Sequence, residues 1–462
     1  MTTETASAVT LPGGEMLAWS DRTDEAGDGP LAALAARLVP AGARVLLAGP
    51  HGPALLDALA HARLTCLLRG YPDAAVVAGR VDRVLVAGPH GLPAGEEYDV
   101  VIAGAGLDAV ESVEGERLGW DGLLARLVGA VRPGGDLLLR LDNPIGLHRL
   151  VATGSWYAGR DDAEWTVGGV LDAARPANLD QVRERMAAAG MRAGTCYAGY
   201  PRTDLTTALV TVEELARRTT SGLLDAVLHA ACTDGYAGRF VLADPARLAV
   251  DALHAGRAAD LAPSWLVLAR RPAADPTDPD DEPDGTGDAA HPLPRVDRPE
   301  NPAPGLGGPA PLPVAFVADP AAGGTVVEVL HGPQGWHWHR TGIAVPSAPA
   351  DAPYAGRELA HRDPAAPDGP VPDGRLLRSL LLDGCLRRDT ALLRRLLRGY
   401  ADWLDGQAEQ GRLAGAVALA GVDNLVVDGD RWGCSTGAGG PTHRHLSTWY
   451  WPGSWDASPP TC

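Results

Sequence analysis

Apolar residues along the first 270 positions follow two spacings that alternate along the chain. In one of them, apolar residues stand three and four positions apart, as they do on one face of a helix. This spacing predicts helices at residues 30–39, 53–62, 123–131 and 179–189, and a longer helical stretch over residues 212–254.

Between these helices lie short, continuous apolar runs of the kind that form buried strands. Glycine and proline, which favour turns, bound most of these runs. The runs predict strands at residues 44–48, 64–68, 83–87, 99–103, 136–141 and 264–269. Because strands and helices alternate, the predicted fold class is α/β with a doubly wound sheet.

The composition changes abruptly after residue 271. Residues 272–313 are rich in proline and aspartate and predict a linker, because they lack the apolar residues that a core needs. Beyond it, we expect a hairpin from residues 314–317 and 325–330, a helical region over 375–404 and a strand over 424–430. The predicted units are a flexible N-terminus (1–19), an α/β domain (20–271), an acidic linker (272–313) and a smaller α+β C-terminal domain (314–462).

The charge balance excludes several classes of protein. The 462 residues carry a formal net charge of −18, which argues against a basic face for duplex nucleic acid. All 40 basic residues are arginine, so the sequence contains no lysine. Chemistry that needs a lysine, such as a Schiff base or the phosphate contact of a P-loop, is therefore excluded.

Metal sites and membrane spans are not predicted either. The six cysteines form no CxxC pair, and the alternating pairs His337 with His339 and His443 with His445 lack an evident third ligand. No apolar run approaches the length of a membrane span, and the first residues are acidic and polar. We expect a cytoplasmic protein without a membrane or nucleic-acid partner.

Several segments in the α/β domain resemble a known family. Residues 98–103 (YDVVIA) and 132–135 (RPGG) resemble the "YDVV" strand and "LKPGG" turn of class I S-adenosylmethionine-dependent methyltransferases. Residues 142–147 are similar to the "ENxxGL" segment of a subgroup linked to bacterial glycan-building enzymes, and residues 197–207 and 263–268 match later stretches of that subgroup. The resemblance implies a Rossmann-like methyltransferase fold with S-adenosylmethionine as cofactor.

In that family, the first strand ends in an acidic residue and a glycine-rich turn, because the cofactor lies against the main chain. The acidic position falls at Leu47, and the three glycine positions fall at Gly49, His51 and Pro53. Only one glycine is kept, and His51 places a side chain where the ligand would pass. Gly52 could restore some freedom one residue later.

The second family landmark is an acidic residue that closes the next strand and accepts hydrogen bonds from both ribose hydroxyls. No carboxylate follows Leu68, and this loss costs roughly 2–4 kcal/mol of binding free energy. Asp57, Asp73 or Asp82 could substitute from a neighbouring turn. The resemblance therefore assigns cofactor contacts to Leu47, Gly49, His51, Gly52, Leu68 and Gly104.

One nine-residue sequence segment occurs twice, with few changes, in this domain. Residues 44–52 nearly repeat as residues 83–91, and both copies end in AGPHG, with His51 in the first and His90 in the second. We interpret the repeat as two strand-to-turn units of one sheet.

Methyl transfer also needs an acceptor site, often with a base that removes a proton. His148 is the candidate base, and Asn143 and Tyr200 are candidates for shaping a substrate pocket. A surface histidine at a helix start is the structural alternative for His148.

The C-terminal domain distantly resembles kinase-like phosphotransferases around residues 422–428, which match their "DNILV" region. Phosphotransfer is not expected, because the chain lacks lysine and residues 431–435 offer no metal-binding aspartate. We interpret the domain as a scaffold or recognition module. Its tryptophans could contact a protein partner or a glycan: Trp336, Trp338, Trp449, Trp451 and Trp455.

Two hypotheses of function follow. The first is S-adenosylmethionine-dependent methyl transfer to a specialised-metabolite or glycan intermediate. The second is a catalytically inactive, methyltransferase-like protein that acts as a binding partner or scaffold for another biosynthetic enzyme. Reuse of the pocket for another reaction, such as cyclisation, is a third possibility.

Overall fold

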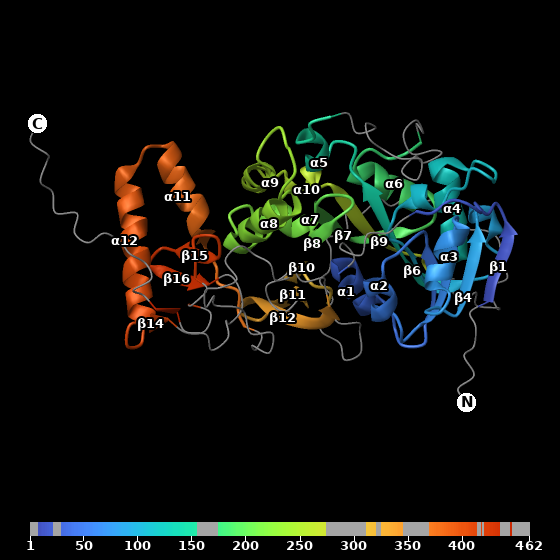
Figure 1. Cartoon of the computed structure of the whole chain (residues 1–462), viewed down its shortest axis with the longest axis horizontal. Coiled ribbons are helices and arrows are strands. Elements are labelled where there is room, and N and C mark those ends of the chain that lie inside the picture. Colours follow the sequence, from blue (N-terminus) through green and yellow to red (C-terminus); the bar gives the residue numbers. More distant parts are fainter. Residues whose placement is uncertain are drawn as a thin grey trace, which may run out of the picture.

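The computed structural model describes residues 8–21, 29–154, 174–273, 311–319, 325–344, 369–413, 417, 420–434 and 444–445. Most of the strands belong to one twelve-stranded sheet (Figure 1). Its parallel half has the order β1 (Ala8–Gly13), β4 (Arg83–Ala87), β3 (Arg63–Leu68), β2 (Arg44–Ala48), β5 (Tyr98–Ala103) and β6 (Val131–Asp142).

This order defines a switch point in the sheet. From β2 the chain moves outward through β3 to β4, and then returns to the other side of β2 with β5 and β6. The predicted α/β, doubly wound fold is therefore confirmed. In folds of this kind, ligands bind outside the carboxyl ends of the strands on either side of the switch point, which here are β2 and β5.

The other half of the sheet is antiparallel. Strand β9 (Ser264–Arg270) lies between β6 and β7 (Arg192–Pro201) and runs antiparallel to both. The carboxyl ends of β6 and β7 therefore lie at the same edge as those of β2 and β5. The sheet continues through β8 (Thr206–Thr211), β10 (Ala315–Asp319), β11 (Thr325–Gly332) and β12 (Gly335–Ala344).

Helices cover both faces of the sheet, because successive strand residues point to opposite sides. Leu46 and Ala48 of β2 belong to one apolar core, and Val45 and Leu47 belong to the other. The first core includes α4 (Gly119–Ala130), α6 (Leu179–Ala188), α8 (Gly222–Gly235) and α9 (Pro245–His254). The second includes α1 (Gly29–Leu38), α2 (Pro53–Ala58) and α3 (Tyr71–Val77).

Short helices α5 (Leu147–Leu150), α7 (Val212–Arg217) and α10 (Ala258–Leu261) complete this unit. The predicted end of the helix over 179–189 is confirmed, since Gly190 follows α6 with a φ of +79°. The turn expected at residues 132–135 instead lies within β6. It forms a bulge, since Tyr98 pairs with Val131 but Val100 pairs with Asp136.

Two expected boundaries differ in the structure. Residues 8–13 were expected to be flexible but form β1, which pairs with β4 in parallel register. This run contains Pro12, which weakens the strand signal but is tolerated at a sheet edge. Residues 315–344 were expected in the C-terminal domain but extend the main sheet, because β10 pairs with β8.

Three contacts with residues far away in the sequence fix this extension. The Tyr197 hydroxyl donates to the Pro313 carbonyl at 2.8 Å, and its ring packs on Phe316 at a centroid distance of 5.7 Å. Arg37 of α1 forms an ion pair with the buried Glu328 of β11. The predicted hairpin is confirmed by β10 and β11, although its turn lies outside the described residues.

The C-terminal unit has its own core and a three-stranded sheet of β13 (Arg375–Leu376), β15 (Leu425–Asp428) and β16 (Arg431–Cys434). Helices α11 (Leu377–Leu386) and α12 (Thr390–Gln407) pack on it, and β14 (Arg412–Leu413) pairs with β17 (Arg444–His445). The helical region expected over 375–404 is broken at Arg388, whose φ is +54°. No helix among the described residues is long and apolar enough to cross a membrane.

Candidate functional site at the switch point

The side chain of His51 fills the space between the ends of β2 and β5. Only 9% of the residue is exposed. Its Nδ1 lies 2.9 Å from the Gly49 carbonyl oxygen, and its Nε2 accepts a hydrogen bond from the Gly104 amide at 3.1 Å. Since Nε2 accepts, the ring proton stands on Nδ1 and the imidazole is neutral.

The glycines beside His51 explain why the chain can fold this way. Gly49 has a φ of +91°, a conformation that side chains rarely adopt. A Cβ atom at Gly104 would stand 2.7 Å from Leu31 and 3.0 Å from His51 Nε2. The turn after β5 therefore has no room for a side chain at Gly104, and the turn after β2 needs glycine at position 49 for its backbone conformation.

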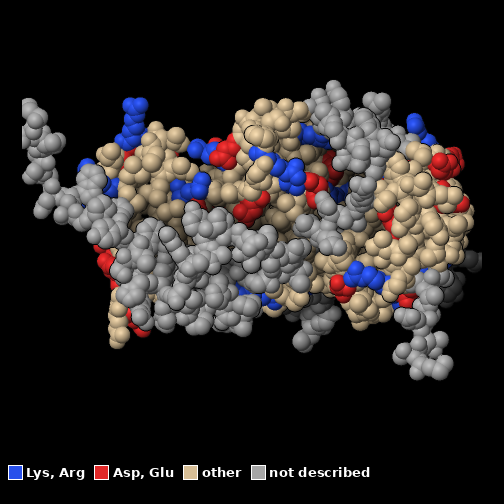
Figure 2. Space-filling model, in the orientation of Figure 1, with Lys and Arg blue, Asp and Glu red and all other residues tan. Residues whose placement is uncertain are grey.

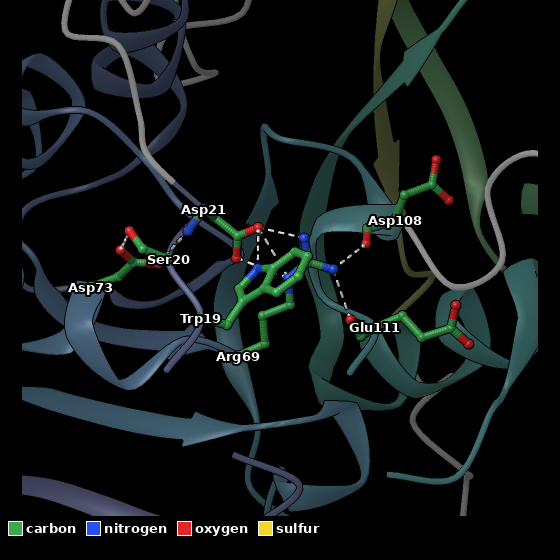
Figure 3. Close-up of polar contacts among 7 residues, drawn as sticks. All are labelled: Trp19, Ser20, Asp21, Arg69, Asp73, Asp108 and Glu111. Atoms are coloured by element: carbon green, nitrogen blue, oxygen red, sulfur yellow. Dashed lines mark hydrogen bonds and ion pairs between the residues drawn. The ribbon is translucent and has the colours of Figure 1, made fainter. Parts of the chain in front are cut away.

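Arg69 follows directly after β3, next to the position where the family resemblance calls for a carboxylate. It is 3% exposed, and its Nε donates to Asp21 Oδ2 at 2.8 Å (Figure 3). Its Nη1 donates to the carbonyl oxygens of Asp108 at 3.1 Å and Glu111 at 2.9 Å. A cation therefore occupies this corner, and its donors are directed to protein acceptors.

The N-terminal segment covers the end of β3 and contributes Asp21 to this ion pair. The indole of Trp19 lies under the Arg69 guanidinium at 5.3 Å and donates to Asp21 Oδ1 at 3.1 Å. Asp73 of α3 accepts from the Ser20 hydroxyl at 2.6 Å and from the Asp21 amide at 2.8 Å (Figure 3). Residues 19–21 are thus held over the end of β3.

None of the three proposed substitute carboxylates faces the crevice as a free acceptor. Asp73 holds the N-terminal segment, as described above. Asp82 accepts from the Leu64 amide at 2.7 Å, at the amino end of β3, and Asp57 forms an exposed ion pair with Arg80.

The six residues assigned to the cofactor by resemblance are brought together, but they do not form an open site. Leu47 and Leu68 are buried in the core, at 0% and 3% exposure. At the positions that the resemblance assigns, the ribose would meet the Arg69–Asp21 pair instead of a free carboxylate, and the cofactor would meet His51 at the glycine turn. The residues of this conformation therefore do not fit S-adenosylmethionine.

His148 lies at the same edge of the sheet, in a cavity of about 550 Å³ beyond β6 and β7. Arg202, Asp204, Tyr236 and Phe240 are among the residues that line it. Burial lowers the pKa of His148 to about 4, although the neighbouring Asp142 opposes this shift. The imidazole is therefore neutral at pH 7, and neither of its nitrogens has a hydrogen-bond partner among the described residues.

Asn143 and Tyr200 do not line the cavity of His148. The Asn143 amide donates to the carbonyl oxygens of Asp260 at 2.7 Å and Ala262 at 2.8 Å. The Tyr200 hydroxyl donates to the Ala258 carbonyl at 2.5 Å, and the residue is fully buried. Both side chains tie α10 to the ends of β6 and β7, so their visible role is structural.

The expected aromatic surface of the C-terminal domain is only partly described. Trp336 and Trp338 of β12 are each 7% exposed, so neither forms an open surface. Trp449, Trp451 and Trp455 lie outside the described residues, as does His443. Among the described residues, no cluster of three or more His, Cys, Asp or Glu side chains could hold a metal ion.

Asp21 and Trp19 were not among the residues expected at the site. They precede the first predicted helix, and a single acidic residue carries no signal of its partner 48 positions away. The unusual arginine at the end of β3 was the available signal, because a buried arginine needs an acidic partner.

No protein family profile and no curated protein matches this chain. Among solved structures, it is similar to Haemonchus contortus phosphoethanolamine N-methyltransferase 2, solved in complex with phosphomonomethylethanolamine and S-adenosylhomocysteine (15% identity, 52% of each chain covered, TM-score 0.27). It is also similar to the CcbJ methyltransferase from Streptomyces caelestis (16% identity, 55% of this chain and 93% of that chain covered, TM-score 0.29). The chain spans about half of the Haemonchus protein. The fold assignment rests on the strand order given above.

Proposed function

We propose that this chain is a catalytically inactive protein of methyltransferase fold that acts as a binding partner or scaffold for another biosynthetic enzyme. The observation that carries this proposal is the buried Arg69–Asp21 ion pair, which lies beside the position that the family resemblance assigns to the ribose of the cofactor. His51 supports it independently, because it closes the glycine turn with two hydrogen bonds.

The free-energy cost of displacing these contacts also supports the inactive assignment. Removing one partner from a buried ion pair costs about 3–5 kcal/mol, and each neutral hydrogen bond adds about 0.5–1.5 kcal/mol. A cofactor that had to displace these contacts would lose roughly 4 kcal/mol of binding free energy, about a thousandfold in Kd. An intrinsic affinity near 1 μM would thereby weaken to about 1 mM.

Methyl transfer to a specialised metabolite or glycan intermediate is the second candidate. The cavity beside His148 favours it, because this cavity opens at the edge of the sheet where a doubly wound fold binds its ligands. In that case, residues 19–21 and His51 would have to move to admit the cofactor. His148 would remain a weak base, since its pKa lies near 4.

Isothermal titration calorimetry with S-adenosylmethionine and S-adenosylhomocysteine separates the two candidates. We expect no saturable heat from the full-length protein at ligand concentrations up to about 1 mM. His51→Gly removes one of the two obstacles to the cofactor, the other being the Arg69–Asp21 pair. His90→Gly, in the second AGPHG copy, is the matched control. Saturable binding to the unmodified protein with a Kd below about 0.1 mM would overturn the inactive assignment and favour methyl transfer.

A further inference from the structure

A larger cavity, of about 1010 Å³, lies where the C-terminal unit meets the sheet unit. Its walls come from the end of α7, the start of α8, β12, the segment before β13, both C-terminal helices and the turn between β15 and β16. Figure 2 shows arginine and acidic side chains close together in this part of the molecule, toward the left of the view.

The junction is held by direct backbone contact. The Gly222 amide at the start of α8 donates to the Gly374 carbonyl at 2.7 Å. Gly374 has a φ of +131°, and a Cβ atom there would stand 2.6 Å from the Val427 carbonyl oxygen of β15. The cavity therefore has a defined wall in which both units take part.

Two residues that line this cavity each carry a buried donor without an acceptor. Trp336 Nε1 and Arg375 Nε are inaccessible to solvent and make no hydrogen bond with the described residues. A buried donor without a partner costs free energy, which a bound acceptor would recover. Since both atoms are donors, a ligand that satisfies them supplies acceptor oxygens.

The charged lining suits a single anionic group rather than a polyanion. The lining contains four arginines and three aspartates: Arg217, Arg218, Arg375, Arg395, Asp373, Asp428 and Asp430. Arg218 stacks on the Trp336 ring at 4.7 Å and lies 3.4 Å from Glu214, whereas Arg375 and Arg395 have no acidic partner among the described residues. These two arginines are the free cations of the cavity.

The rest of the lining is apolar. Leu380 of α11, Leu392 and Leu396 of α12 and Val427 of β15 face the cavity, with Trp432 of β16 beside Gly399. Side chains of this kind bind the hydrocarbon or aromatic body of a small molecule, and the few polar groups fix its orientation.

We propose that this cavity binds a small organic anion with an apolar or aromatic body and one carboxylate, sulfonate or phosphate group. The anionic oxygens accept hydrogen bonds from Trp336 Nε1, Arg375 and Arg395, and the body lies against the leucines of α11 and α12. This inference does not depend on whether the switch-point crevice binds a cofactor.

Fluorescence titration of the full-length protein tests the proposal with 8-anilinonaphthalene-1-sulfonate, which joins an aromatic body to one sulfonate. We expect saturable binding that Arg395→Gln weakens about tenfold, the worth of one charge-assisted hydrogen bond. Arg394→Gln is the matched control, because Arg394 is exposed on the same helix but does not line the cavity. It should leave the affinity unchanged.

Two further measurements make the test specific. N-phenyl-1-naphthylamine, which lacks the sulfonate, should bind equally to Arg395→Gln and to the unmodified protein. Trp336→Phe keeps an aromatic six-membered ring but loses the Nε1 donor, and it should weaken binding of the sulfonate probe only. The proposal fails if Arg395→Gln and Arg394→Gln bind the sulfonate probe equally, or if both probes weaken together.

Discussion

His51 and His90 lie in identical AGPHG segments but have different roles in the structure. His51 makes two hydrogen bonds at the centre of the sheet, whereas His90 is exposed and packs beside Gly14, Gly88 and Gly115. The difference comes from the neighbours. Strand β2 lies at the switch point, and β4 lies next to the edge strand β1.

We predict that His51→Ala destabilises the protein by about 1–3 kcal/mol, because it removes two buried hydrogen bonds and leaves the Gly104 amide without an acceptor. His90→Ala should change the free energy of unfolding by less than about 0.5 kcal/mol. Urea denaturation of the two variants measures the difference. Equal losses would show that His51 does not hold the crevice closed.

Asp21 is the counter-ion of the buried Arg69 guanidinium. Asp21→Asn leaves a buried guanidinium without its counter-ion, and we expect a loss of about 3–5 kcal/mol of stability. Asp57→Asn is the matched control, since the Asp57–Arg80 pair is exposed and such pairs contribute about 0–1 kcal/mol. Thermal unfolding should separate the variants clearly. A loss from Asp21→Asn no larger than that of the control would contradict the buried pair.

His148 predicts a pH dependence. Its pKa falls from 6.5 in the unfolded chain to about 4 in the folded protein. Below pH 6.5 the unfolded state therefore binds more protons, and stability decreases as the pH falls toward 4. The contribution is about 3 kcal/mol.

His148→Gln removes the titrating group, so the free energy of unfolding should vary less between pH 6.5 and pH 4 than in the unmodified protein. Urea titrations at several pH values measure the slope. An unchanged slope would show that His148 is not buried as a neutral imidazole.

At the scale of the elements, the sequence identifies the central strands well. The five parallel strands β2 to β6 follow the predicted runs, because continuous apolar stretches bounded by glycine and proline carry a strong local signal. Strand β1 and the extension by β10 to β12 were not assigned to this sheet, since their pairing depends on partners far away in the sequence. Only part of the candidate site at the switch point could be predicted from the sequence. His51 and the missing carboxylate can be read from the sequence, whereas the Arg69–Asp21 pair forms only in the folded chain.

The break between α11 and α12 gives a prediction at this scale. Arg388 has a φ of +54°, which costs a residue with a side chain about 1–2 kcal/mol. Arg388→Gly should therefore stabilise the hairpin by about 1 kcal/mol, despite the greater freedom of glycine in the unfolded chain. Arg387→Gly, one position earlier with a φ of −83°, should destabilise it. Chemical denaturation checks both signs, and a loss from Arg388→Gly would contradict the assigned break.

For the whole molecule, the continuous sheet means that the unit resembling a methyltransferase does not end at residue 271. Beyond that residue, β10 covers the edge of β8, and Phe316 lies at 0% exposure in the second core. A fragment of residues 1–271 would expose the unpaired backbone groups of β8 and leave Tyr197 without its acceptor.

We predict that this fragment aggregates or melts well below a fragment of residues 1–344, which keeps β10 to β12 paired with β8. Size-exclusion chromatography and thermal melting compare the two. The 1–344 fragment should remain monomeric because its core is complete, and equal melting temperatures would show that β10 to β12 contribute nothing to the sheet. The same fragments also test the cavity at the junction with the C-terminal unit. Because neither fragment contains α11 or α12, both should lose saturable binding of the sulfonate probe.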